Sequence, residues 1–260
     1  MRRLAILMPA FALLAGAAGF YLRLMELKKV FDESTGLPIR GSGITFALIT
    51  LTVVFLLIAF AFALRVRLKH TVQAGFENAF GTEYLAYPLV FFVIGIVWLG
   101  STVKYFFSIN DAGTIPMPEL IFSILSALAA VALALYAIEE YQDPRRKSRY
   151  ALSIVPTLFM CFWLILFYRQ NASNPVLLNY CYECLAIITS ALGFYFTSGF
   201  VYSRPAPGKA VFSFLVAIFF CFVTLADEHD ISIRLIYISI IIINIVYSSM
   251  LIRNMRRKNP

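Results

Sequence analysis

Apolar residues gather along this chain into eight long runs that are separated by short polar segments. The runs cover residues 4–22, 43–64, 85–107, 119–138, 150–168, 175–202, 210–226 and 232–252. A helix needs about 20 mainly apolar residues to cross the hydrocarbon core of a bilayer, and each run is close to that length or longer. The pattern therefore predicts an all-α, polytopic integral membrane protein. We expect a helical bundle of eight transmembrane helices that forms a single transmembrane domain over residues 1–260.

The composition supports a membrane protein over a soluble one. Hydrophobic residues make up 61% of the chain and charged residues 14%, whereas soluble domains have about 45–50% and about 25%. In a soluble protein the net charge of +8 would suggest nucleic acid as a partner. Here the excess of lysine and arginine is explained by cytoplasmic loops. We therefore expect the lipid bilayer as a partner and no nucleic acid.

The distribution of basic residues between the runs predicts the orientation. With alternating crossings, 15 of the 22 lysines and arginines fall on the side that holds both termini, six fall on the other side, and Lys104 lies within a run. Because cytoplasmic loops carry the excess of basic residues, both termini are expected in the cytoplasm. Arg2 and Arg3 before the first run also resemble the start of a signal peptide. No small-residue cleavage site follows, so this run is interpreted as a retained helix.

Two ionisable residues lie inside the predicted spans, where charge is costly and often functional. Glu183 is about eight residues from the outer end of run 175–202, which corresponds to a depth of roughly 12 Å, and Lys104 is near the outer end of run 85–107. Asn179 precedes Glu183 by one turn on the same face. We expect Glu183, Asn179 and Lys104 to bind a small solute or ion, with Glu183 as the carrier if protons are coupled. The alternatives are a structural hydrogen bond for Glu183 and an interfacial position for Lys104.

All four cysteines fall in the fifth to seventh runs, at similar predicted depths in the outer half of the membrane. They are Cys161, Cys181, Cys184 and Cys221, and Cys181 and Cys184 form a C-x-x-C motif. That spacing is typical of redox or metal chemistry in soluble proteins. Cysteine is also a common small apolar core residue. A thiol or metal centre and plain helix packing both remain open.

A short acidic segment, Asp227-Glu228-His229-Asp230, separates the last two runs. Its carboxylates and imidazole are suitable ligands for a divalent cation. A tight, charged turn of this kind is more commonly just solvated. We therefore interpret it as a solvated outer turn, with a cation site as the alternative.

Three functions are compatible with this pattern. The leading hypothesis is a transporter or permease-like protein for a small solute or cation, with no cofactor. The alternatives are a membrane thiol or metal oxidoreductase that uses the cysteines, and a non-catalytic subunit or scaffold that packs against partner helices. The sequence contains no Walker A, H-E-x-x-H or G-x-S-x-G motif, so an enzyme is less favoured than a transporter.

One segment resembles a known group of proteins. The stretch from Glu26 to Pro38, ELKKVFDESTGLP, follows a short apolar helix. It is similar to a pattern in uncharacterised multi-span membrane proteins of anaerobic Gram-positive bacteria, and the similarity covers about the first fifth of the chain. The resemblance implies a bacterial plasma membrane as the location. It implies no particular activity.

Overall fold

A computed structural model describes residues 2–31, 39, 41–73, 75–81, 86–110, 116–142, 149–173, 176, 178 and 180–257. Its helices are α1 (Arg2–Lys29), α2 (Gly43–Lys69), α3 (Phe76–Phe80), α4 (Ala86–Asn110), α5 (Met117–Gln142), α6 (Arg149–Asn171), α7 (Cys181–Val201), α8 (Pro207–Thr224) and α9 (Ile231–Asn254). Two short strands, β1 (His70–Thr71) and β2 (Arg256–Arg257), pair antiparallel. Within the described ranges, eight helices are long and apolar enough to cross a membrane, and α3 is too short. The expected number of apolar helices is confirmed.

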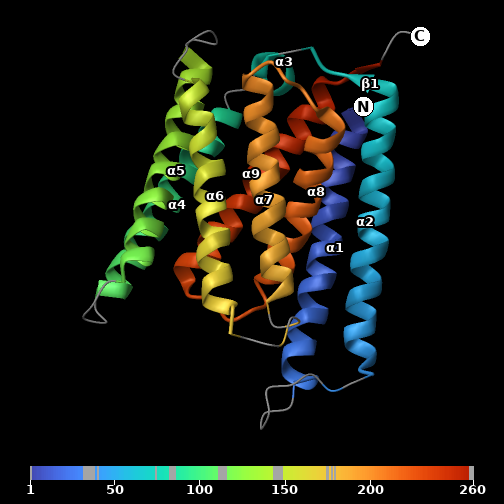
Figure 1. The fold of residues 1–260 in the computed structure, drawn as a ribbon. Coiled ribbons are helices and arrows are strands. Elements are labelled where there is room, and N and C mark those ends of the chain that lie inside the picture. The colour runs from blue at the N-terminus through green and yellow to red at the C-terminus, as the bar shows by residue number, and fades with distance from the viewer. Residues whose placement is uncertain are drawn as a thin grey trace.

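The bundle is organised around α8 and α9 (Figure 1). In the most apolar stretch of each helix, 78% of residues are buried in α8 and 67% in α9, against 28% in α2 and 33% in α1. Helix α8 packs against α1, α2, α7 and α9, whereas α5 packs mainly against α4 and α6. Helix α7 is intermediate, with 56% of its stretch buried.

Helices α4 and α5 are held together by small and hydroxyl side chains. The Trp98 indole N–H donates to Ser126 Oγ at 3.0 Å, and Ser126 Oγ lies 2.7 Å from Thr102 Oγ1. All three side chains are buried. Hydrogen bonds of this kind stabilise helix contacts in lipid, where exposed hydroxyls have no water to bind.

Both ends of the described chain lie at the same end of the bundle (Figure 1). After α2, His70 pairs with Arg257 and Thr71 with Arg256, so the segment after α9 is hydrogen-bonded to the segment after α2. Helix α3 caps this terminal end, where Asn254 Nδ2 donates to the carbonyls of Ala79 and Gly81 at 3.0 Å each. Helix α3 buries Phe76 and Phe80 against the protein.

Two helix boundaries differ from the predicted spans, and both differences affect the opposite end of the bundle. Helix α1 continues to Lys29, seven residues beyond run 4–22, so Arg23 and Glu26 are helical. Helix α7 begins at Cys181, six residues after the expected start at 175. Hydropathy placed these boundaries wrongly because it records apolar content and not the position where helical hydrogen bonding begins. Glu183 therefore lies in the first turn of α7 and not two turns inside it.

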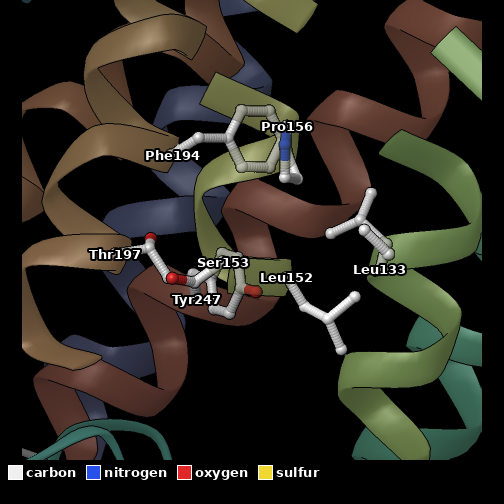
Figure 2. Close-up of a pocket in the computed structure, with 8 residues that line it drawn as sticks. Leu133, Leu152, Ser153, Pro156, Phe194, Thr197 and Tyr247 are labelled. Carbon is white, nitrogen blue, oxygen red and sulfur yellow. The ribbon is translucent and has the colours of Figure 1, made fainter. Parts of the chain in front are cut away.

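The bundle interior between α5, α6, α7 and α9 contains a small cavity of about 10 Å³ (Figure 2). Its lining includes Leu133, Pro156, Phe194 and Tyr247, with Ser153 and Thr197 as polar neighbours. A cavity needs roughly 10–15 Å³ of this volume to hold one water molecule. This cavity is too small for a solute.

Candidate functional site

The first turn of α7 places Glu183 against the loop between α8 and α9 and against α9 itself. The Tyr237 hydroxyl donates to Glu183 Oε1 at 2.9 Å. His229 Nδ1 lies 3.9 Å from the same oxygen, and the two side chains are only 10% exposed for His229 and 17% for Glu183. The partial positive charge at a helix N-terminus also favours a carboxylate in this position. Glu183 is thus held at a defined place, and its side chain is mostly buried.

The local sequence explains why His229 turns inward. Asp230 caps α9, because its side chain accepts a hydrogen bond from the Ser232 backbone N–H at 3.1 Å. The cap fixes the direction in which the preceding residue enters the bundle. His229 then packs on Tyr237, with ring centroids 5.5 Å apart.

Burial keeps the His229 ring neutral. Loss of water around the ring lowers its pKa to about 4, and the positive charge of Arg234 acts in the same direction. The ring is hydrogen-bonded to the backbone of Thr224, while Nε2 is buried without a hydrogen-bond partner. In a neutral imidazole one ring nitrogen donates and the other accepts, so the ring can accept one hydrogen bond from a ligand.

Beside Glu183 and His229 lies a cavity of about 180 Å³. Its remaining lining comes from α4, α5, α6 and α9: Tyr105, Phe122, Trp163, Leu166, Phe167, Gln170, Asn171 and Ile233. Asn171 Nδ2 donates to the Phe167 carbonyl at 3.0 Å, which leaves its Oδ1 to accept. The described lining includes no lysine or arginine. The cavity can hold several water molecules or one small solute.

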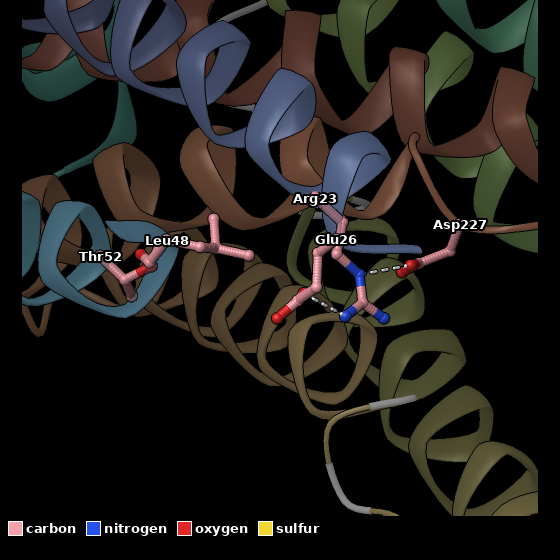
Figure 3. A network of polar contacts seen from close by, with 5 residues as sticks. All are labelled: Arg23, Glu26, Leu48, Thr52 and Asp227. Carbon is pink, nitrogen blue, oxygen red and sulfur yellow. Dashed lines mark hydrogen bonds and ion pairs between the residues drawn. The ribbon is translucent and has the colours of Figure 1, made fainter. Parts of the chain in front are cut away.

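A buried ionic network lies at the same end of the bundle (Figure 3). Arg23 Nε donates to Asp227 Oδ1 and Arg23 Nη1 to Glu26 Oε2, both at 2.8 Å. The side chains of Arg23, Glu26 and Asp227 are 0%, 1% and 11% exposed. Arg23 also lies over the Tyr182 ring, 5.4 Å from its centroid. The network joins α1, α7 and the α8–α9 loop.

Among the described residues, the ionic network of Arg23, Glu26 and Asp227 contains more carboxylates than cations. One guanidinium faces two carboxylates, and Glu26 Oε1 and Asp227 Oδ2 are buried without a hydrogen-bond partner. Burial raises the pKa of Asp227, and the nearby Arg23 opposes that shift. Asp227 also interacts electrostatically with Glu183. The network and the cavity wall thus form one electrostatically coupled region with an excess of acidic groups.

Of the three residues that the sequence predicts for the site, the structure describes Glu183 and Lys104. Glu183 lines the cavity, whereas Asn179 lies outside the described residues. Lys104 is exposed on α4, and its charge acts on Asp230. The ion pairs described for Glu183 and its neighbours do not include Lys104. Of the three expected residues, the structure therefore places only Glu183 in this wall within its described part.

The acidic segment before α9 is divided by the fold, which corrects the interpretation of a solvated turn. Asp227 points to Arg23 and His229 to Glu183, while Glu228 and Asp230 are exposed. The alternative of a cation site built from this segment has no support either. Across the described part of the chain, no group of three or more His, Cys, Asp or Glu side chains could hold a metal ion.

The four cysteines are free thiols in different surroundings. Cys161 is exposed on α6, Cys181 and Cys184 are half-buried on α7, and Cys221 is buried on α8. Cys221 Sγ lies 3.3 Å from Ser190 Oγ. Only Cys221 has the position of a core residue, and the described residues contain no group of three or more such side chains that could hold a metal ion.

Sequence reasoning missed Arg23 and Glu26 as site residues, and it assigned Asp227 and His229 to a solvated turn with a divalent-cation site as the alternative. Arg23 and Glu26 are three residues apart, which is a helical spacing for an ion pair, but the predicted first span ended before them. No local signal links Arg23 to Asp227, because the two residues are 204 positions apart.

The chain matches no protein-family model, no curated protein and no solved structure. The class is therefore defined by the fold alone. Eight long apolar helices, with a polar, acidic region at one end, make this chain an integral, multi-pass membrane protein.

Proposed function

We propose that this protein is a permease-like transporter that binds a small cationic solute or ion in the Glu183 cavity. The observation that carries the proposal is a cavity wall that contains a buried carboxylate and hydrogen-bond acceptors, with no lysine or arginine among its described residues. An isolated carboxylate in such surroundings is costly unless a cation or proton compensates it. Glu183 is the group that binds the cation, and Tyr237 holds its carboxylate in place.

The proposal includes an orientation. The Glu183 end faces the outside of a bacterial plasma membrane, and both termini lie in the cytoplasm. The excess of basic residues at the terminal end supports this orientation, and the resemblance of the Glu26–Pro38 segment supports a bacterial membrane. If the termini are cytoplasmic, a reporter that is active only in the cytoplasm should be active when it is fused after Lys258. Activity of an export-dependent reporter at that position would contradict the orientation.

To test transport, the purified protein is reconstituted into membranes, and these membranes are adsorbed on a solid support. Concentration jumps of sodium, potassium, propylammonium and tetramethylammonium chloride are applied, and transport currents are recorded. We expect at least one of these cations to give a current with the unaltered protein. Glu183→Gln, which keeps the size of the side chain but removes its charge, is expected to reduce that current by about tenfold or more, since a charged hydrogen bond contributes about 1.5–3 kcal/mol.

The matched control is Glu228→Gln, which removes an exposed carboxylate from the neighbouring loop. It should leave the current unchanged. Absence of current for all four cations, or full current in a folded Glu183→Gln protein, would refute the proposed function.

A further inference from the structure

The Glu183 cavity has features that restrict the chemical class of its ligand beyond positive charge. We propose that it binds a primary ammonium group carried on a small, partly apolar skeleton. This inference rests on the proposed function, because it takes the same cavity as the binding site. Three independent features of the described residues support it: the number of acceptors, the balance of charge and the nature of the remaining wall.

The first feature is the set of hydrogen-bond acceptors. Glu183 accepts one bond from Tyr237 at Oε1, which leaves capacity on its carboxylate. Asn171 donates to its own helix through Nδ2, so Oδ1 remains as an acceptor, and His229 contributes a neutral ring with an unpartnered Nε2. A primary ammonium has three N–H donors in a tetrahedral arrangement. A ligand with several N–H donors would therefore satisfy the hydrogen-bond acceptors of this wall.

The second feature is the charge balance. Among the described residues, Arg23 is paired with the carboxylates of Glu26 and Asp227, whereas the described partners of the Glu183 carboxylate are the Tyr237 hydroxyl and neutral His229. Asp227 is close enough to Glu183 to interact electrostatically with it. A bound monovalent cation offsets part of this excess of carboxylates, which are mostly buried. An anionic ligand is disfavoured for the same reason.

The third feature is an aromatic wall fixed relative to the carboxylate. Tyr237 both donates to Glu183 and packs on Trp163, with ring centroids 5.0 Å apart. Trp163 in turn meets Phe122 edge to face, at 5.5 Å and 81°. The same wall includes Tyr105 and Phe167. Aromatic rings pack against alkyl groups, and their negative faces attract an ammonium cation.

These features disfavour a bare metal ion. Calcium takes six to eight oxygen ligands, and magnesium needs near-octahedral oxygen coordination. The described wall supplies one carboxylate, and no cluster of three or more metal-ligating side chains is present in the described part of the chain.

The volume of the cavity limits the size of the ligand. At about 180 Å³ it is below the range of about 300–1,000 Å³ that is usual for drug-sized ligands. A ligand of a few heavy atoms fits this volume.

The test compares ligands that each lack one or more of these properties, by calorimetric titration of the purified full chain in detergent. Propylammonium chloride is the probe. The comparisons are 1-propanol, which lacks the charge and the N–H donors, tetramethylammonium, which lacks N–H donors, and sodium, which lacks both N–H donors and an apolar part. We expect propylammonium to bind at least about tenfold more tightly than each comparison compound, a difference of about 1.4 kcal/mol. Equal binding of tetramethylammonium or sodium, or no binding of propylammonium, would overturn the assignment.

Variants separate the contributions. Glu183→Gln should weaken propylammonium binding by about tenfold or more, and Trp163→Leu should weaken propylammonium more than it weakens sodium. Tyr237→Phe keeps the ring but removes the hydroxyl, so it tests the position of the carboxylate if Glu183→Gln does not fold. Equal loss of propylammonium and sodium binding in Trp163→Leu would count against the aromatic contribution.

The two proposals fail in different ways. Sodium currents that depend on Glu183, without selective binding of propylammonium, would retain the transporter and refute the ligand class. Selective binding of propylammonium without any transport current would retain the site and refute the transport function.

Discussion

Replacing Arg23 by methionine should lower the free energy of unfolding by about 3–5 kcal/mol, because it leaves buried carboxylates without their cation. Arg23 is fully buried and donates to Asp227 and Glu26 at 2.8 Å. Methionine retains much of the apolar volume, so the loss arises mainly from charge. The measurement is thermal or denaturant unfolding of the purified protein in a mild detergent.

Two further variants test the cause of that loss. In the triple variant Arg23→Met, Glu26→Gln and Asp227→Asn, the network is neutral, and most of the stability should return. Lys28→Met removes an exposed cation from the same helix and should change stability by less than about 0.5 kcal/mol. If Arg23→Met is no less stable than Lys28→Met, the network does not stabilise the fold.

The second large effect is expected at the contact between α1 and α8. A Cβ atom on Gly16 would lie 2.8 Å from Phe222 Cβ and 3.6 Å from the Phe219 backbone Cα. Gly16→Leu therefore forces the two helices apart, and we expect a loss of about 3 kcal/mol or more. Small residues permit such close approaches between helices in membranes. The loss is measured as a fall in the unfolding temperature in detergent.

Gly100→Leu on α4 is the matched control, because no atom lies within 4 Å of the Cβ position there. It replaces a helical glycine by a better helix former at an exposed site, so stability should be unchanged or slightly increased. An equal loss of stability in both variants would show that the effect is not due to the α1–α8 contact.

The number of membrane-spanning helices was predictable because it depends on hydropathy averaged over stretches of about 20 residues. Eight apolar runs predict eight helices whatever their packing, and errors of a few residues at the ends do not change that number. The ends themselves were less predictable. Run 4–22 ends at the first charged residue, although α1 continues through Arg23 and Glu26 to Lys29. Hydropathy treats an arginine after an apolar run as interfacial, whether or not a partner neutralises it.

The candidate site was predictable only in part. Glu183 is notable because a carboxylate within an apolar run has few plain explanations. His229 and Asp227 looked like solvated turn residues, and nothing in their neighbourhood along the chain distinguishes a turn that faces water from one that folds inward. Their positions follow from tertiary contacts with Tyr237 and Arg23, which lie on other helices.

The central place of α8 has a consequence for biosynthesis. Helices α1 and α2 leave the ribosome first, yet both pack against α8, the seventh of the eight spanning helices. The 204 residues between Arg23 and Asp227 take about 10–40 s to translate at about 5–20 residues per second. During that interval the arginine lacks the carboxylate of Asp227. The nascent chain therefore depends on the insertion machinery, or on a second charged residue nearby such as Glu26, to shelter that guanidinium until the late helices arrive.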